Sequence, residues 1–256
     1  MAQIRVAAAA SLSVSLNQLK PAFETLYPQH TVEYIYQGSS GFLAGQINQQ
    51  IIHPHVYMAA SPYPMDTVQY GTPASPYPPR GLVAGSRFNY LGNRLVIIRN
   101  NYALPVSISS FSGVTYSSTA VHNVPVFIAQ PDSPYYVPAG NYARYAFVEA
   151  GNWFSFVESY ATMAGMFSVT QVLNTVASHP GPAIGVVYYS DAMSRVGDVH
   201  IIAEASPAIN NLITYPVGII AGHIPPEVAA AQAFTAYLQT QEGLQFFLNN
   251  HFTSRL

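Results

Sequence analysis

The sequence contains no cysteine, which excludes disulfide scaffolds, zinc sites built from thiolates and cysteine nucleophiles. It also lacks any stretch that approaches the roughly 20 uninterrupted apolar residues of a membrane-spanning helix. Walker-type phosphate loops, dinucleotide fingerprints and the serine elbow of α/β hydrolases are missing as well. With 256 residues, the chain is long enough for one large or two small domains with a sizeable buried core.

Charge is scarce. Lysine, arginine, aspartate and glutamate make up 8% of the chain, where about 25% is usual, and the formal net charge is −2. Such a small net charge is poor for solubility at neutral pH. Because no basic patch is available for nucleic acid or for an anionic membrane, we expect neither as a partner.

The scarcity of carboxylates predicts tolerance of acid, because acid denaturation is largely the protonation of paired carboxylates. One hypothesis is that the protein works outside the cytoplasm, in a periplasm or equivalent compartment, in acidic surroundings. Compositional drift is an equally weighted alternative, and a melting temperature that falls steeply below about pH 4 would contradict the acidic habitat. No signal peptide precedes the first strand, so we expect an exported protein to be a processed form that carries an initiator Met.

Hydrophobic periodicity predicts repeated strand–helix units in the first 60 residues. Alternation from Ile4 into an alanine run is typical of a strand, and apolar residues then recur at helical spacing up to Leu26. Pro21 lies inside that helix and should kink it or split it in two. Further strands are expected over residues 31–36 and 55–60, with a helical pattern between them. These units indicate an α/β fold with a parallel sheet and helices packed on it.

The rest of the chain continues in the same manner, without internal repeats. A segment rich in Pro, Tyr and Gly, residues 61–81, is expected to be an ordered surface excursion, because strands resume soon after it. Strands are expected over residues 93–100, 124–130, 183–190, 199–205 and 214–222, and helices over residues 139–148, 169–177 and 225–250.

Three strand-to-helix turns contain small residues, which let a backbone approach an anion closely. They are AAAASL (residues 7–12), GSSG (residues 38–41) and VPAGNY (residues 137–142). In open α/β sheets, ligands bind beyond the carboxyl ends of the strands, where helix N-termini offer N–H groups. Singly, each serine is more simply explained as the N-cap of its own helix.

Six ordered motifs run through essentially the whole chain. They are AAASL (residues 8–12), SSGFLAGQI (39–47), LGNRLVI (91–97), VPAGNYA (137–143), GVVYYSD (185–191) and YPV (215–217), followed by an aromatic at Phe252. In this order they resemble the molybdate-binding proteins of bacterial ABC importers. The resemblance implies a two-lobed, periplasmic-binding-protein-like α/β fold, with a mostly parallel sheet flanked by helices in each lobe and the ligand in the cleft between them.

The resemblance also implies that neutral hydrogen-bond donors hold an oxyanion. The implied donors are the hydroxyl and N–H of Ser11 and of Ser40 in the first lobe, and the N–H groups of Ala139 and Val169 and the phenol of Tyr188 in the second. Ser39 replaces Ser40 if the alignment shifts by one residue, and Ala10 and Pro138 are further candidates.

The implied lobes are residues 1–84 with 216–256, and residues 90–210, with hinge crossings near residues 85–92 and 211–217. Binding is then expected to close the hinge, and a membrane ABC permease is expected to recognise the closed form. The resemblance implies a monomer with no enzymatic activity, no cofactor and no metal bound by side chains.

The chemistry of the donors narrows the anion, because none of the implied residues is an acid. Several N–H and O–H donors at helix N-termini can satisfy the oxygens of a dianion without a counter-charge. Hydrogen phosphate needs an acceptor for its proton and is disfavoured, whereas molybdate or tungstate is distinguished from sulfate by cavity size. The alternatives that stay open are sulfate or another oxyanion, an anion-sensing domain and, less favoured, an enzyme on the same fold.

One stretch departs from the family. Its members usually have an aspartate at the start and at the end of the third strand, where this chain has Val56 and Pro62. The Pro/Tyr-rich residues 61–81 are also unlike the family. We interpret the lost acids as structural, in keeping with the scarcity of carboxylates.

Two other groups of polar residues have simpler explanations. His53 and His55 are conceivable metal ligands, but the sequence offers no third ligand, so we expect a pair of loop histidines. Asp191 follows Tyr188 closely and is expected to cap the next turn rather than to orient the phenol.

Overall fold

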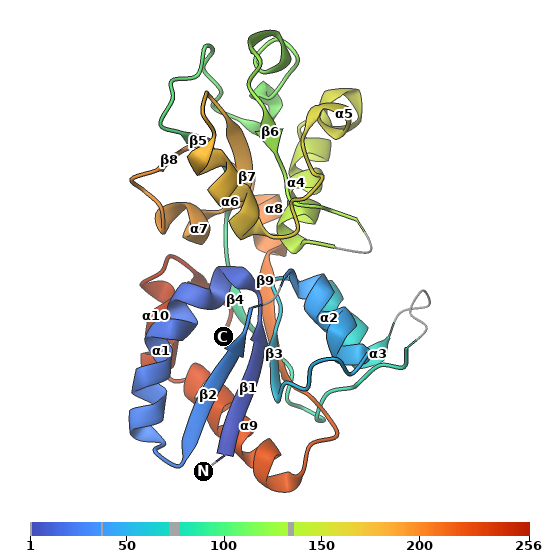
Figure 1. The fold of residues 1–256 in the computed structure, drawn as a ribbon, viewed down its shortest axis with the longest axis vertical. Helices are drawn as coiled ribbons and strands as arrows, with labels where there is room; N and C mark the ends of the chain where they lie inside the picture. Colours follow the sequence, from blue (N-terminus) through green and yellow to red (C-terminus); the bar gives the residue numbers. More distant parts are fainter. Residues whose placement is uncertain (1, 37, 72–76, 133–135) are drawn as a thin grey trace. The chain divides into compact units, whose positions relative to one another are not determined.

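The computed structural model describes residues 2–36, 38–71, 77–132 and 136–256. The chain forms two compact units: unit 1 comprises residues 1–92 and 214–256, and unit 2 comprises residues 93–213. Each unit is an α/β structure with its own sheet and its own covering helices (Figure 1). Among the described residues, no helix combines the length and the apolar character needed to cross a membrane.

Unit 1 is built on a six-stranded sheet with the order β10-β4-β9-β3-β1-β2. Its strands are β1 (Ala2–Ala8), β2 (His30–Ile35), β3 (Val56–Met58), β4 (Phe88–Gly92), β9 (Thr214–Ile219) and β10 (Thr253–Ser254). β1 runs parallel to β2 and β3, whereas β9, which returns from unit 2, runs antiparallel to β3 and β4. The sheet is therefore mixed, and the expectation of a mostly parallel sheet is wrong.

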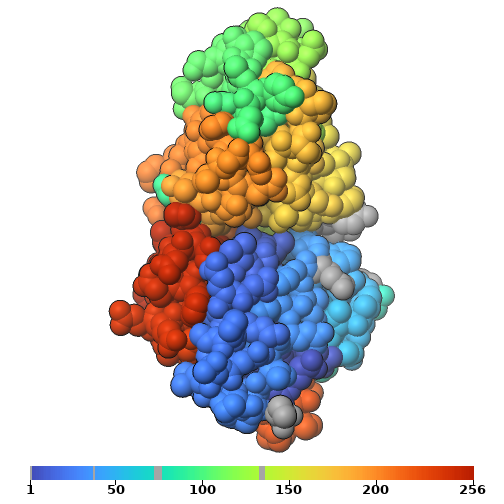
Figure 2. Space-filling view, turned by 60° about the vertical axis from the view of Figure 1, so that its left-hand side comes forward, coloured from blue at the N-terminus to red at the C-terminus, as the bar shows by residue number. Residues whose placement is uncertain are grey.

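Helices cover this sheet and are held by a buried aromatic core. They are η1 (Ala10–Leu12), α1 (Ser13–Leu26), α2 (Ser40–Asn48), α3 (Pro62–Tyr70), α9 (Pro225–Leu238) and α10 (Gln241–Leu248). Phe23 of α1 meets Phe234 and Tyr237 of α9, with ring centroids 5.3 and 5.6 Å apart. The surface of α10 lies against that of α1 (Figure 2), where the Asn250 amide donates to the Gln18 side chain at 2.7 Å.

Pro21 neither ends nor splits α1, which continues from Ser13 to Leu26. A proline removes one intrahelical hydrogen bond. The apolar face compensates, since Leu16, Leu19 and Phe23 are completely buried against the unit. Of the two predicted outcomes, a kink or a split, the split is therefore wrong, because tertiary packing overrides the local signal for it.

Unit 2 has a four-stranded sheet with the order β6-β7-β5-β8. Its strands are β5 (Leu95–Asn100), β6 (Val126–Phe127), β7 (Ile184–Tyr188) and β8 (Val199–Glu204), and its helices are η2 (Phe111–Gly113), η3 (Ala120–His122), α4 (Pro138–Glu149), η4 (Trp153–Val157), α5 (Glu158–Tyr160), α6 (Val169–Ser178), α7 (Tyr189–Met193) and α8 (Pro207–Leu212). β6 and β7 are parallel, whereas β5 is antiparallel to both β7 and β8. This sheet is also mixed rather than mostly parallel.

The chain passes between the units at residues 92/93 and 213/214. The two crossing segments pair with each other, since Leu91 is opposite Tyr215 and Gly92 is opposite Thr214. Residues 90–92, which the sequence analysis assigned both to the second lobe and to a hinge crossing, belong to unit 1 in the structure. The sequence analysis missed β4 because the strong apolar run that follows it, β5, dominated the pattern.

The Pro/Tyr-rich segment contains helix α3, which begins with Pro62 in its first turn. Proline is favoured there, because its missing N–H would have no intrahelical partner in the first turn. Residues 72–76 of the same segment lie outside the described residues.

Candidate ligand-binding site

The first candidate donor, Ser11, lies in the short helical turn that follows β1. The chain leaves the strand at Ala8, forms the single turn η1, and continues into α1. Ser11 is buried, with 9% exposure, and its Oγ lies 3.2 Å from the Tyr215 hydroxyl of β9. Neither η1 nor α1 has a side-chain hydrogen bond at its N-cap. Ser11 is therefore not a helix cap, and its hydroxyl bonds to a tyrosine that the sequence analysis did not select.

The two serines of the GSSG turn have different roles. Ser39 is the N-cap of α2, where its hydroxyl accepts the Phe42 N–H at 3.1 Å. Ser40 is the first residue of the helix, and its hydroxyl accepts the Ala60 N–H at 3.0 Å. The Ser40 carbonyl in turn accepts a 2.6 Å hydrogen bond from Tyr57. Ser39 therefore has the capping role expected of a single serine, whereas Ser40 is held from two sides by β3 and the residues that follow it.

Ser11 and Ser40 belong to the same edge of the unit 1 sheet. β1 and β3 are parallel, with Ala8 opposite Met58, so both strands end at this edge. Ser11 follows β1 directly, and the bond to Ala60 ties Ser40 to the segment that follows β3. The carboxyl edge of a sheet that receives helix N-termini is where α/β proteins bind ligands. Ala10 is part of the same turn as Ser11 and is half-buried.

In unit 2, the VPAGNY turn forms the start of α4. Pro138 is the first helical residue and has no N–H, so Ala139 carries the first N–H of the helix. The N-cap residue, Val137, makes no side-chain hydrogen bond to these N–H groups. Gly140 packs so closely on the preceding segment that an added Cβ would lie 2.0 Å from the Ala129 carbonyl oxygen. A glycine is thus required to seat this helix start at the carboxyl end of β6.

Val169 begins α6, whose N-cap Ser168 accepts the Gln171 N–H at 3.1 Å. Position N1 of a helix has no intrahelical acceptor for its N–H. The helix packs along β7, since a Cβ at Gly185 would meet Val176 and Val172 at 2.7 and 3.0 Å. α6 ends shortly before β7 begins, so its N-terminus lies toward the carboxyl end of that strand.

Tyr188 is the last residue of β7 and pairs with Leu95 of β5. Its side chain is almost completely buried. Because β6 and β7 are parallel, the ends of both strands lie at one edge, where α4 also begins. Ala139, Val169 and Tyr188 therefore belong to the carboxyl edge of the unit 2 sheet. Pro138 lies beside Ala139 in the same turn and is buried.

The candidate donors are electrically neutral. The acidic residue that lies nearest to one of them in the sequence is Asp191, three residues after Tyr188. Burial raises the pKa of the Asp191 carboxyl to about 7. Its Oδ2 makes no hydrogen bond with the described part of the chain, and α7 has no side-chain cap. The expectation that Asp191 caps this turn is therefore wrong. Arg94, in contrast, has two partners. Its guanidinium donates to the Glu204 carboxylate at 2.9 Å, and its Cζ atom lies 3.6 Å from the centroid of the Tyr189 ring.

The His53/His55 pair separates in the structure. His53 is exposed, whereas His55 lies with His223 and Glu227, whose ligand-type atoms are all within 4.8 Å of one another. The Nδ1 atom of His55 accepts the Arg5 backbone N–H at 2.9 Å, which places the ring proton on Nε2. A protonated Nε2 has no lone pair for a metal. Hydrogen bonds explain the cluster: His55 bonds to β1, and His223 bonds to the Pro54 carbonyl at 2.9 Å and to Glu227 of α9 at 3.2 Å.

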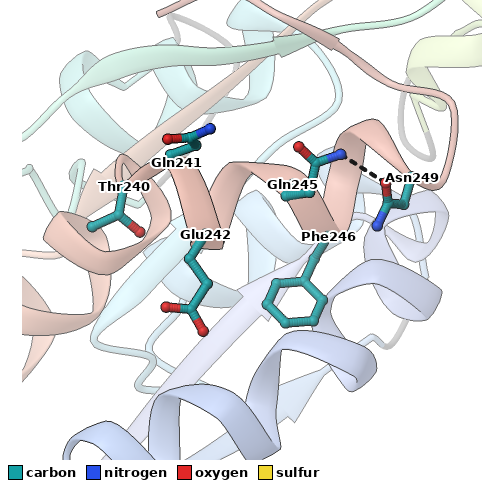
Figure 3. Close-up of a pocket in the computed structure, with 6 residues that line it drawn as sticks. All are labelled: Thr240, Gln241, Glu242, Gln245, Phe246 and Asn249. Carbon is teal, nitrogen blue, oxygen red and sulfur yellow. Dashed lines mark hydrogen bonds between the residues drawn. The ribbon is translucent and has the colours of Figure 1, made fainter.

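A cavity of about 640 Å³ opens along α10 of unit 1. Its lining comes from α10 and from the residues directly before and after that helix, with Glu242 and Phe246 on the same side (Figure 3). The Gln245 amide donates to Asn249 at 2.7 Å within this lining. The cavity contains none of the candidate donors.

A family model of bacterial extracellular solute-binding proteins matches residues 4–253, nearly the whole chain. The chain belongs to the bacterial extracellular solute-binding protein family. The members of this family bind solutes and are not enzymes. The structure confirms the expected α/β fold. The family assignment, a family of solute-binding proteins, agrees with the expectation of a protein that is not an enzyme.

Several proteins that are similar to this chain are named for the anion that they bind. The molybdate-binding protein ModA of Escherichia coli is 26% identical over 174 residues, which are 68% of this chain and 63% of ModA. The periplasmic molybdate-binding protein of Azotobacter vinelandii has a similar structure, with a TM-score of 0.75, 17% identity and 98% of each chain covered. The sulfate-binding protein SubI of Mycobacterium tuberculosis reaches a TM-score of 0.71 at 14% identity, over 98% of this chain and 86% of SubI.

Sequence analysis did not select Tyr57 and Tyr215, the residues that hydrogen-bond to Ser40 and Ser11. Tyr57 and Tyr215 lie in strands and are completely buried, so their apolar neighbours marked them only as core. Tyr215 stands in the YPV motif, which was the one signal available. His223 and Glu227 had no recognisable spacing relative to His55.

Proposed function

We propose that this solute-binding protein captures a tetrahedral oxyanion, molybdate or tungstate, outside the cytoplasm and delivers it to a membrane ABC permease. The observation that carries the proposal is the hydrogen bond that the Ser40 hydroxyl oxygen accepts. Its hydroxyl oxygen receives the Ala60 N–H, so the hydroxyl proton is turned away from Ala60 and is available to a ligand. The E. coli relative named for molybdate and the resemblance of the six motifs support this choice of anion.

The donors fit a dianion without counter-charges. Ser11 and Ser40 supply hydroxyl groups at the sheet edge of unit 1, and Ala139, Val169 and Tyr188 supply N–H groups and a phenol at the sheet edge of unit 2. Helix N-termini carry partial positive charge, and unpaired N–H groups there satisfy anion oxygens. We infer that both sets bind one anion and that binding closes the hinge formed by the paired crossing segments, β4 and β9. A permease is expected to recognise this closed monomer.

The anion is best identified by isothermal titration calorimetry of the anion-stripped protein. Molybdate, tungstate, sulfate and phosphate are titrated at pH 7 and again near pH 4. We expect tight binding of molybdate and tungstate and none of phosphate. Binding of sulfate alone would keep the donor set but change the ligand, and no heat with any of the four anions would overturn the proposal.

A further inference from the structure

The hydroxyl groups of Ser11 and Tyr215 form a buried hydrogen bond in unit 1. The two oxygens are 3.2 Å apart, and the residues are 204 positions apart in the sequence. Either hydroxyl can be the donor, and the choice decides what Ser11 presents to a ligand. If Ser11 donates to the tyrosine, its oxygen lone pairs are left for the ligand. If Tyr215 donates, the Ser11 proton is left instead.

Ser40 shows which arrangement suits an anion. Its oxygen receives a proton from the Ala60 N–H, a group that can only donate. The hydroxyl of Ser40 therefore turns its own proton elsewhere. An oxyanion has acceptors only, so it is stabilised by a serine in this state and repelled by one that presents lone pairs.

We propose that Tyr215 is a positioning residue for Ser11: its hydroxyl donates to Ser11 Oγ and turns the serine proton toward the bound oxyanion. Tyr215 thus does for Ser11 what the Ala60 N–H does for Ser40. When each hydroxyl donates to the next group in a chain of hydrogen bonds, the hydroxyls polarise one another. The Ser11 hydroxyl, the last in this chain, would thereby become a stronger donor. This inference rests on the proposed function, since it concerns how the same site is prepared.

The Tyr215 ring is held by aromatic contacts, so its hydroxyl has a fixed place. Phe252 packs edge-on against it, with centroids 5.4 Å apart and an interplanar angle of 89°. Phe252 in turn meets Phe247, and Phe247 meets Tyr90. Edge-to-face contacts of this kind orient rings specifically. The hydroxyl can therefore be removed without moving the ring, which makes Tyr215→Phe a clean test.

The test is a double-mutant cycle with Ser11→Ala and Tyr215→Phe, read by calorimetric titration with molybdate and with sulfate. We expect Tyr215→Phe to weaken binding of the preferred anion about five- to tenfold. In the Ser11→Ala background the same change should have no further effect, because the serine through which Tyr215 acts is gone. If Ser11→Ala alone makes binding too weak to titrate, the single Tyr215→Phe variant decides the question.

Tyr34→Phe is the matched control, since Tyr34 also donates a hydroxyl hydrogen bond in unit 1, to the Leu16 carbonyl at 2.9 Å. It should leave the affinity unchanged. Unchanged affinity in Tyr215→Phe would overturn the positioning role, as would an equal loss in both serine backgrounds, which would mean that Tyr215 acts without Ser11. In either case a wild-type protein that still binds the anion leaves the proposed function intact. A wild-type protein that binds no oxyanion would overturn both.

Discussion

The two units offer donors of different kinds. In unit 1, the candidate donors include serine hydroxyls whose oxygens are held by other protein groups, Tyr215 at Ser11 and Ala60 at Ser40. In unit 2, two of the three are backbone N–H groups at the starts of α4 and α6. The two groups of candidate donors therefore differ in which substitutions would remove a donor.

This difference predicts opposite responses to truncation. A hydroxyl is lost when serine becomes alanine, whereas a backbone N–H survives every substitution except proline. We therefore expect binding by unit 1 to depend on side-chain chemistry, and binding by unit 2 to depend mainly on the backbone at the starts of its helices. The predictions below test this contrast, beginning with the largest effect.

Val169→Pro should weaken oxyanion binding about ten- to a hundredfold, because it removes a hydrogen bond to a charged group, worth roughly 1.5–3 kcal/mol. The helix should survive, since proline is favoured at position N1 and Ser168 already has the extended backbone, with φ −155° and ψ 158°, that a following proline requires. Affinity is measured by calorimetry, and helix content by circular dichroism.

The control is Gln241→Pro, at N1 of α10, where Thr240 also has an extended backbone, with φ −70° and ψ 157°. It removes an N–H that has no proposed role in binding and should leave the affinity unchanged. Equal affinities in wild type and Val169→Pro would remove this N–H from the site.

Ser40→Ala should weaken binding about tenfold and also lower the melting temperature, because the buried Ala60 N–H loses its acceptor, at a cost of about 1–3 kcal/mol. Ser39→Ala should cost about 1 kcal/mol of stability through the lost cap, with no change in affinity. The pair is compared by calorimetric titration and thermal melting. The reverse pattern would show that Ser39 is the donor.

Asp191→Asn should stabilise the protein at pH 8 by on the order of 2 kcal/mol. The folded protein holds the proton of Asp191 up to about pH 7, whereas the unfolded chain releases it near the ordinary pKa of this carboxyl, 3.8. Wild-type stability from this group is therefore complete below about pH 4 and is lost as the pH rises through 7. Melting temperatures between pH 4 and 8 measure the effect.

The exposed Asp132, paired with Arg144 at 2.8 Å, provides a control. Asp132→Asn should change stability little at any of these pH values, because exposed ion pairs contribute about 0–1 kcal/mol. If Asp191→Asn behaved in the same way, the buried carboxyl would not be the group that titrates.

His55→Asn should flatten the dependence of stability on pH between about 4 and 6.5, an effect on the order of 1 kcal/mol. Burial, together with the nearby His223 and Arg5, lowers the pKa of His55 to about 4, while Glu227 opposes this shift. Since the unfolded chain takes up the proton near pH 6.5, wild-type stability falls as the pH drops through this range. Asparagine keeps an acceptor for the Arg5 N–H but cannot titrate.

His53→Asn, at the exposed neighbour, is the control and should change the melting temperature little, because substitutions at exposed positions usually change stability by less than about 0.5 kcal/mol. An unaltered slope in His55→Asn would contradict the burial argument. His55 and Asp191 act in opposite directions, so the acidic habitat suggested by the composition stays a prediction that a melt below pH 4 would test.

Much of the fold could be predicted from local patterns. The strands near residues 31–36 and 93–100 and the helices near residues 139–148 and 169–177 all occur within a few residues of their expected places. Pattern reasoning failed where distant segments decide the outcome. It missed β4, which is a strand because β9 and β10 pair with it. It also allowed Pro21 to split α1, which tertiary packing holds together as one helix.

By itself, the sequence determined the strand-to-helix turns, their small residues and the neutral character of the candidate donors. These are local properties, set by residue size, backbone propensity and the absence of charge. Only the tertiary structure decided which candidate donors form hydrogen bonds within the protein, and with which partners. Ser40 receives the Ala60 N–H, and Ser11 meets Tyr215, because sheet pairing brings β3 and β9 beside the turns that follow β1 and β2. Hydrogen-bond direction depends on such partners, and no local pattern contains it.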